Sequence, residues 1–200
     1  NVCKKQAEKF GARFKIDIAT KVTLIGDGFE LELMSEEKIK TKALIVATGA
    51  SARWLGVPSE EKYKGRGVST CATCDGAFYK NKEVLVIGGG DSAMEESLFL
   101  TKFASRITII HRRDEFRASK IMQARVLNNP KIKVVWDSVV EEVLGDGKKV
   151  NGAKLKNLKT KKVADVKCDG VFVAIGHVPN TKFLQGLLDM DELGYLKADP

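Results

Sequence analysis

The two parts of the chain differ in how apolar and polar residues alternate. In the first part, short apolar runs rich in β-branched residues predict strands at 16–22, 29–34 and 43–47, after a helix that ends near Arg13. The segment 53–67 then places glycine and proline among charged residues, which is typical of a linker. We therefore place a domain boundary in this segment.

Beyond the boundary the pattern alternates between strands and helices. Continuous apolar runs at 83–87 and 106–110 predict parallel strands covered on both faces, and 91–103 between them has the spacing of a helix. This alternation predicts an α/β fold with a Rossmann-like parallel sheet. The further predicted elements are a helix at 119–127, strands at 133–136 and 170–175, and a β meander over 139–167 with glycine-containing hairpin turns.

A glycine-rich turn joins the strand at 83–87 to the helix that follows it. In the pattern Gly-x-Gly-x-x-Ala, Gly88 permits the tight turn, Gly90 lets a pyrophosphate approach the backbone, and Ala93 allows close packing of helix on strand. The N–H groups at the helix start face the anion. We therefore predict a dinucleotide site. Its binding residues would be Gly88, Gly89, Gly90, Asp91, Ser92 and Ala93.

The end of the second strand indicates which dinucleotide is favoured. An NAD site usually places an acidic residue there, about twenty residues after the glycines, to bond the ribose 2′-hydroxyl. This chain instead has His111, Arg112 and Arg113, with Arg117 soon after. Guanidinium groups suit a 2′-phosphate through charge-assisted, often bidentate bonds, so the residues favour NADPH. The alternative is a solvated basic turn.

Cys71 and Cys74 form a CxxC pair, followed directly by Asp75. A disulfide across so short a loop stabilises the fold by only about 2 kcal/mol in the loop-entropy model, so reversible redox exchange is the better use. The carboxylate of Asp75 would move protons between thiol and solvent. Structural zinc is the alternative, but it needs four ligands, and Cys3, Cys168 and both histidines stand alone in the sequence.

Composition narrows the classes of partner. The formal net charge is +8, but the lysines are spread along the chain without interleaved aromatic residues, so we expect no nucleic-acid partner. No apolar run approaches the roughly 18 to 20 residues that cross a bilayer, and we expect no membrane association. An acidic protein partner suits the charge. The first residues do not have the pattern of a secretory signal, and we expect a cytoplasmic location.

Four motifs, in this order and spacing, resemble those of low-molecular-weight thioredoxin reductases. They are the CxxC at 71–76, the glycine turn at 88–93, the basic run at 111–118 and the segment 174–180. The segment 47–53 adds to the resemblance, which covers essentially the whole chain. It implies an NADPH domain that carries the CxxC and is inserted into a second Rossmann-like domain that binds FAD.

The resemblance also implies domains and roles. Residues 1–54 would be a portion of the FAD domain, 55–176 the NADPH domain, and 177–200 the return segment of the FAD domain. The two connecting segments would act as hinges for a rotation between NADPH-to-flavin and flavin-to-disulfide transfer. The implied activity passes electrons from NADPH through FAD and the cysteines to thioredoxin, and the full-length enzyme would be a homodimer.

Individual residues receive roles from the same resemblance. Cys74 would lie nearer the flavin, Cys71 would attack the thioredoxin disulfide, and Asp75 would serve as acid and base. Thr48 and Gly49 would contact FAD, and Gly176 would contact a cofactor.

The chain departs from the family pattern at both ends. No Gly-x-Gly-x-x-Gly precedes residue 83, and the chain stops before the Gly-Asp segment that closes over the flavin, so we expect a partial copy lacking both ends of the FAD domain. Two alternatives remain. One is the flavin-dependent reductase of a peroxiredoxin system, and the other is a non-catalytic NADP-binding module in which FAD is not retained.

Overall fold

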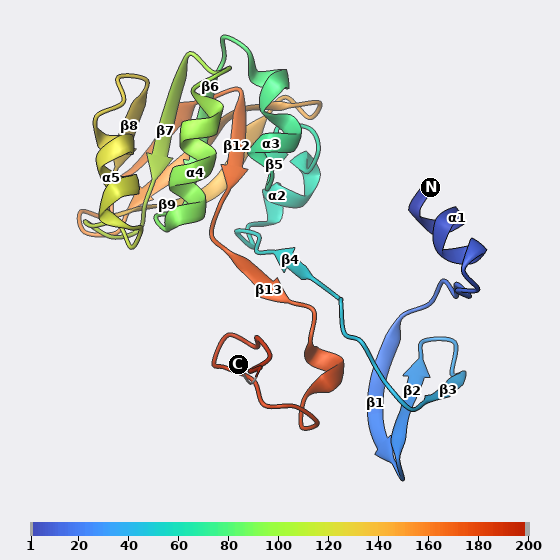
Figure 1. Cartoon of the computed structure of the whole chain (residues 1–200). Helices are drawn as coiled ribbons and strands as arrows, with labels where there is room; N and C mark the ends of the chain where they lie inside the picture. Colours follow the sequence, from blue (N-terminus) through green and yellow to red (C-terminus); the bar gives the residue numbers. More distant parts are fainter. Residues whose placement is uncertain (1, 199–200) are drawn as a thin grey trace. The chain divides into compact units, whose positions relative to one another are not determined.

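Figure 1 shows a computed structural model of the chain, which describes residues 2–198. The chain forms two compact units. The smaller contains the chain up to Ser51 and from Val178 onward, and the larger runs from Ala52 to His177. The start of the predicted N-terminal helix, Asn1, lies outside the described residues, as do positions 199 and 200 of the expected return segment.

The larger unit is built on a parallel sheet of five strands in the order β5-β12-β6-β7-β8. The strands predicted at 83–87 and 106–110 are confirmed with the same bounds, and the α/β class with a parallel sheet is confirmed. The strands are β5 (Val68–Ser69), β6 (Glu83–Ile87), β7 (Arg106–Ile110), β8 (Ile132–Val135) and β12 (Gly170–Val173).

Two different layers cover this sheet (Figure 1). Helices α4 (Asp91–Leu100) and α5 (Lys120–Leu127) pack on one face. The other face packs against the antiparallel sheet of β9 (Ser138–Gly145), β10 (Val150–Asn157) and β11 (Val163–Lys167), which confirms the predicted meander. Among residues 2–198, no helix has the length and apolar character needed to cross a bilayer.

The side chains of β6 show why the strand is apolar on both faces. Val84 and Val86 belong to the cluster under the helices, while Leu85 and Ile87 belong to the cluster under the meander. Successive side chains of a strand point to opposite faces, so a strand between two layers must be apolar throughout. All four side chains are buried. This packing fixes the carboxyl end of β6, where the glycine turn begins.

The segment 53–67, predicted to be a linker, contains a packed helix, so that prediction is wrong. Helix α2 (Pro58–Tyr63) has proline in its first turn, where the missing N–H has no cost. Glu60 is 3% exposed, and its carboxylate accepts hydrogen bonds from the N–H groups of Leu55 (2.8 Å) and Gly56 (3.0 Å). Glu60 therefore holds the backbone at Leu55 and Gly56 in place, just before α2.

The smaller unit contains helix α1 (Val2–Lys9) and an antiparallel sheet in the order β1-β2-β3. Strands β1 (Ala19–Ile25) and β2 (Gly28–Leu33) lie close to the predicted positions, while β3 (Lys38–Thr41) was not predicted. The predicted strand at 43–47 is wrong, because this apolar run has no partner strand among the described residues. An apolar run forms a strand only where a second strand supplies hydrogen bonds.

Two short strands lie where the chain passes between the units. Strand β4 (Ala50–Ala52) pairs with β13 (His177–Pro179) in a two-stranded sheet. The short 3₁₀ helix η2 (Lys182–Leu184) follows β13. Both crossings of the chain therefore have regular backbone structure.

Candidate functional site

A cavity of about 610 Å³ opens at the carboxyl ends of β6, β7 and β12. Ligands of open parallel sheets bind at this edge. Ala93 lies behind the cavity wall and is completely buried. All the other residues predicted to bind the nucleotide in the larger unit line the cavity: Gly88, Gly89, Gly90, Asp91, Ser92, His111, Arg112, Arg113, Arg117 and Gly176.

The three glycines of the turn are required for different reasons. At Gly88 (φ +153°) an added Cβ would lie 2.3 Å from the carbonyl oxygen of Ala174, and at Gly89 it would lie 2.2 Å from the ring of His111. At Gly90 it would meet nothing within 4 Å. Packing within the protein therefore requires the first two glycines, while the third leaves backbone open to a ligand.

This difference predicts opposite effects for two alanine variants. Gly89→Ala should lower the free energy of unfolding by about 1 to 3 kcal/mol, because the new methyl overpacks the core against His111. Gly90→Ala should leave stability unchanged but weaken NADPH binding about tenfold or more, because its methyl group enters the space beside the turn. Thermal unfolding and NADPH titration of both variants measure these effects. Equal loss of stability in both variants would contradict the assignment of Gly89 to packing and of Gly90 to nucleotide binding.

His111 supports the turn from beneath. The residue is 6% exposed, and its Nε2 atom lies 3.0 Å from the backbone oxygen of Glu115. Burial lowers the pKa of His111 below its ordinary value, so the ring is neutral at pH 7. The Arg117 N–H donates to the carbonyl of Gly89 at 2.8 Å and ties the basic run to the turn. The neutral ring of His111 thus supports the turn by packing against Gly89 and adds no charge to the cavity.

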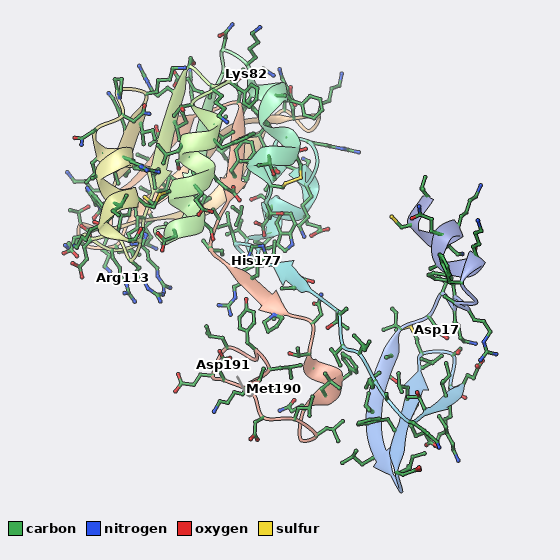
Figure 2. The ribbon with its side chains drawn as sticks, viewed as in Figure 1. Asp17, Lys82, Arg113, His177, Met190 and Asp191 are labelled. Carbon is green, nitrogen blue, oxygen red and sulfur yellow. A yellow bond between two sulfur atoms is a disulfide. The ribbon has the colours of Figure 1, made fainter. Side chains whose placement is uncertain are left out.

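The three arginines of the basic run supply positive charge at the cavity. Arg112, Arg113 and Arg117 are exposed, and within residues 2–198 none of them forms a salt bridge. The neighbouring acid, Asp114, is bound to Lys159 at 2.8 Å, and this hydrogen bond lowers the pKa of Asp114. Figure 2 shows Arg113 at the end of the larger unit opposite to Lys82. The guanidinium charge is therefore available to an anion in the cavity.

Asp91 has a positioning role that the sequence did not indicate. Its carboxylate accepts hydrogen bonds from both the N–H and the hydroxyl of Ser119, each at 2.9 Å. These bonds lower the pKa of Asp91. Asp91 begins α4 and Ser119 precedes α5. The two hydrogen bonds therefore join the starts of these helices and fix the position of the loop that carries the arginines. Asp91 lines the cavity, but its carboxylate is already engaged.

Sequence reasoning missed Arg53 as a cavity residue. Arg53 donates its N–H to the carbonyl of Gly176 at 2.9 Å and its Nε–H to the carbonyl of His177 at 3.2 Å. Gly176 has φ +95°, a conformation that favours glycine. The two crossing segments of the chain are thus joined beside the cavity. Nothing in the local sequence around Arg53 indicated this pairing.

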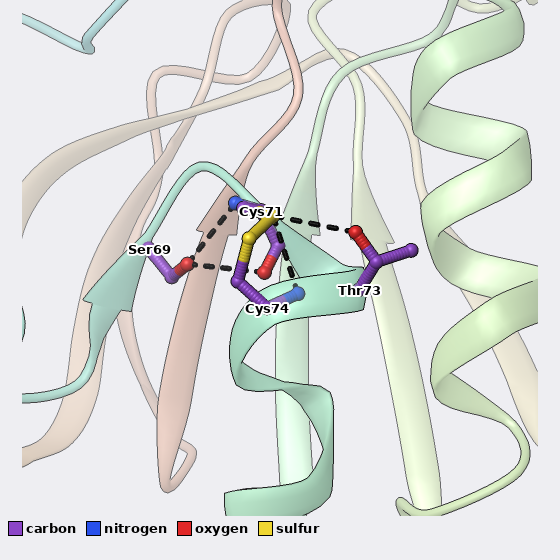
Figure 3. The surroundings of a disulfide bond; sticks show 4 residues. All are labelled: Ser69, Cys71, Thr73 and Cys74. Carbon is purple, nitrogen blue, oxygen red and sulfur yellow. Dashed lines mark hydrogen bonds between the residues drawn. A yellow bond between two sulfur atoms is a disulfide. The ribbon is translucent and has the colours of Figure 1, made fainter. Parts of the chain in front are cut away.

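A disulfide joins Cys71 and Cys74 at the start of the short helix α3 (Ala72–Asp75), as Figure 3 shows. Ser69 Oγ accepts the N–H of Cys71 at 3.1 Å. Cys71 Sγ accepts the N–H of Cys74 at 3.2 Å and lies 3.3 Å from the hydroxyl of Thr73. These groups would also stabilise a thiolate on Cys71. In the described part of the chain, no group of three or more His, Cys, Asp and Glu side chains could hold a metal.

The disulfide is accessible from solvent. Cys74 is exposed, while Cys71 and Asp75 are half-buried. Asp75 also lines a second hollow of about 250 Å³, which continues along the 3₁₀ helix η1 (Gly76–Tyr79). Phe78, at the edge of this hollow, is 73% exposed. The hollow also contains three basic side chains, Arg66, Lys82 and Lys149.

Thr48 and Gly49 lie in the smaller unit. Both are exposed, and Gly49 has φ +64° with nothing within 4 Å of an added Cβ. Asn180 donates its side-chain N–H to the carbonyl of Thr48 and its backbone N–H to the carbonyl of Gly49, both at 3.0 Å. The turn is therefore fixed and its backbone is open to a ligand.

The cavity and the exposed disulfide both lie in the larger compact unit. Residues 2–200 match the family model described as pyridine nucleotide-disulphide oxidoreductase. The chain belongs to this family. Its likeness to thioredoxin reductases is confirmed by the relatives that follow.

The relatives are similar over nearly the whole of this chain. It is 47% identical to a thioredoxin reductase of Rickettsia felis, over 96% of the chain and 62% of the relative, and 50% identical to one of Streptomyces coelicolor, over 97% and 60%. The crystal structure of Lactococcus lactis thioredoxin reductase matches with TM-score 0.83 and 43% identity, over 96% of this chain and 63% of that one. The chain thus spans somewhat less than two thirds of these relatives.

Proposed function

We propose that the chain is the NADPH-binding part, with portions of the FAD domain, of a thioredoxin-disulfide reductase. Residues 55–176 would form the NADPH domain, and 1–54 with 177–200 the FAD-domain portions. The observation that carries the proposal is an accessible disulfide in the same compact unit as a cavity lined by a glycine turn and by arginines. The similarity to thioredoxin reductases supports the choice of partner.

The cavity fits NADPH. The pyrophosphate would lie against the backbone at Gly90 and the N–H groups at the start of α4, where an added Cβ meets nothing. The 2′-phosphate would be bound by Arg112 and Arg113, with Arg117 as a further candidate. Asp91 and His111 would position these groups, through Ser119 and Gly89 respectively.

The smaller unit fits a contact with FAD at Thr48 and Gly49. The open backbone at Gly49, held by Asn180, is suited to close approach by a ligand. FAD, when bound, would relay electrons between nicotinamide and the disulfide.

The cysteines would perform the last transfer. The thiolate of Cys71 attacks the thioredoxin disulfide, which breaks that S–S bond and forms a mixed disulfide. Cys74 then attacks the Cys71 sulfur, restores the Cys71–Cys74 disulfide and releases thioredoxin as a dithiol. Two electrons pass to thioredoxin, and its two sulfurs take up two protons. Asp75, beside Cys74 in α3, would exchange these protons with solvent.

The surface beside the disulfide suits a protein partner. An exposed aromatic side chain such as Phe78 provides apolar contact area. In the hollow, the basic side chains Arg66, Lys82 and Lys149 outnumber the acidic Asp75 and Asp169. An acidic thioredoxin would be attracted to it. A homodimer for the full-length enzyme and a cytoplasmic location belong to the same proposal.

The last transfer can be tested with this chain, because it needs no flavin. The chain is reduced with dithiothreitol, freed of reductant and mixed with oxidised thioredoxin, and thiols are then labelled and counted on each protein. We expect thioredoxin to gain two thiols per chain and the chain to lose two. Preferential transfer to an oxidised peroxiredoxin would support the alternative reductase, and transfer to neither would reject both. Absorbance at the flavin bands shows separately whether FAD is retained.

A further inference from the structure

The turn between β10 and β11 lies against the loop that carries the arginines. Backbone hydrogen bonds join the two segments through Asp137, whose N–H donates to the carbonyl of Arg113 at 3.1 Å and whose carbonyl accepts the N–H of Leu158 at 2.6 Å. Within the turn, the side-chain oxygen of Asn157 accepts the N–H of Lys159 at 3.1 Å. These bonds hold the start of the turn, and with it Lys159, beside the arginine loop.

Lys159 binds two carboxylates from this position. Its Nζ atom lies 2.8 Å from Oδ2 of Asp114 and 3.1 Å from Oδ2 of Asp137. The hydrogen bonds to Asp114 and then to Asp137 raise the pKa of Lys159, so the lysine is charged at neutral pH. Asp114 directly follows Arg113 in the basic run, and its side chain is 69% exposed. The partner of Asp114 is therefore an ammonium group from another segment and not a guanidinium group of its own loop.

Without this ammonium group, Asp114 would be an unpaired carboxylate within the basic run. A carboxylate forms charge-assisted, often bidentate hydrogen bonds with a guanidinium group, and a phosphate forms the same kind of bond. Exposed side chains change rotamer within nanoseconds, so an unpaired Asp114 could turn toward an arginine of the run. It would then compete with a bound phosphate for that arginine.

Lys159 and Asp114 can influence the cavity only from outside it. Neither residue lines the cavity, whereas Arg112, Arg113 and Arg117 do. We propose that Lys159 is a positioning residue for the 2′-phosphate site, which keeps Asp114 paired and so leaves the arginines of the basic run to the phosphate. The inference rests on the proposed function as an NADPH-binding chain. It assigns a determinant of nucleotide choice to a segment more than forty residues away in sequence, since 45 residues separate Lys159 from Asp114.

Dissociation constants of both nucleotides for variants of the chain test this role. Lys159→Ala should weaken NADPH binding about three- to fivefold, because the unpaired Asp114 binds an arginine, while NADH binding should change less than about twofold. Lys159→Arg keeps the charge and should retain most of the wild-type affinity. Lys156→Ala is the matched control, because Lys156 is a lysine of the same meander that pairs with Glu141 at 2.7 Å and does not line the cavity. This control should leave both constants unchanged.

A double-mutant cycle separates competition by Asp114 from a simple loss of positive charge. If Lys159 acts by keeping Asp114 paired, Asp114→Asn alone should leave NADPH affinity near the wild-type value. Adding Asp114→Asn to Lys159→Ala should then restore that value. If net charge alone matters, Asp114→Asn should strengthen NADPH binding by about the factor that Lys159→Ala weakens it. Such an additive result would overturn the proposal.

The wild-type constants distinguish failure of this inference from failure of the proposed function. A wild type that binds NADPH no better than NADH would reject the NADPH assignment, and the role of Lys159 with it. A wild-type preference that persists in full in Lys159→Ala would overturn the role of Lys159 alone. Equal losses of NADPH and NADH in Lys159→Ala would also overturn it, because they would show that the lysine supports the fold.

Discussion

Replacing either Cys71 or Cys74 by serine should abolish thioredoxin reduction while NADPH binding stays at the wild-type level. A two-electron exchange requires both sulfurs, because the first attacks thioredoxin and the second resolves the mixed disulfide. The nucleotide cavity is lined by neither cysteine. Thiol transfer from the reduced chain and NADPH titration measure the two properties separately. In the complete enzyme, flavin reduction by NADPH should also persist.

The free cysteines provide the controls for this experiment. Cys3 is exposed, so Cys3→Ser tests whether an accessible thiol outside the CxxC pair contributes to the transfer. Cys168 is buried, and burial raises the pKa of its thiol to about 12, so it stays protonated and unreactive. Cys3→Ser and Cys168→Ser should both keep full thiol transfer to thioredoxin. Loss of NADPH binding together with thiol transfer in the Cys71 or Cys74 variants would show that the disulfide supports the fold.

The single variants also identify the attacking sulfur. Hydrogen bonds from Cys74 N–H and Thr73 favour a thiolate on Cys71, although Cys74 is the more exposed of the two. We weigh the hydrogen bonds above exposure, because the thiolate is the reactive species. Cys74→Ser should then trap a mixed disulfide with thioredoxin. Trapping by Cys71→Ser instead would assign the attack to Cys74.

The parts of the fold that sequence predicted are those with a local signal. The strands β6 and β7 were predicted with correct bounds, because a strand buried on both faces reads as an unbroken apolar run. The glycine turn was predicted because three glycines stand between such a strand and a helix. The structure adds the reason for Gly89, which is the ring of His111, the residue directly after β7. That contact joins residues distant in sequence.

The parts that sequence missed depend on partners elsewhere in the chain. Helix α2 was hidden in a segment of linker composition, and its buried Glu60 is explained only by the N–H groups that it accepts. Arg53 is held beside the cavity by a hydrogen bond from its backbone N–H to the carbonyl of Gly176, which lies far along the chain. None of these has a periodic or compositional signal.

The arginines of the basic run should give NADPH a preference over NADH of about a hundredfold. Hydrogen bonds to charged groups contribute about 1.5 to 3 kcal/mol each, so two contacts to a 2′-phosphate could contribute about 3 to 6 kcal/mol. All three arginines are exposed, and solvent screening favours the lower figure. Since about 1.4 kcal/mol is a factor of ten, about 3 kcal/mol corresponds to roughly a hundredfold.

Replacing Arg112 and Arg113 together by alanine should remove most of this preference by weakening NADPH alone, because NADH has no 2′-phosphate. The matched control is the pair Arg106→Ala and Arg125→Ala, which removes the same charge from positions that do not line the cavity. Dissociation constants of both nucleotides for the wild type and both double variants decide the matter. An equal loss of NADPH affinity in the control would show that the effect comes from net charge and not from contacts in the cavity. Equal losses of NADPH and NADH in the Arg112/Arg113 variant would show that these arginines support the fold, so the cavity would have no specific site for a 2′-phosphate.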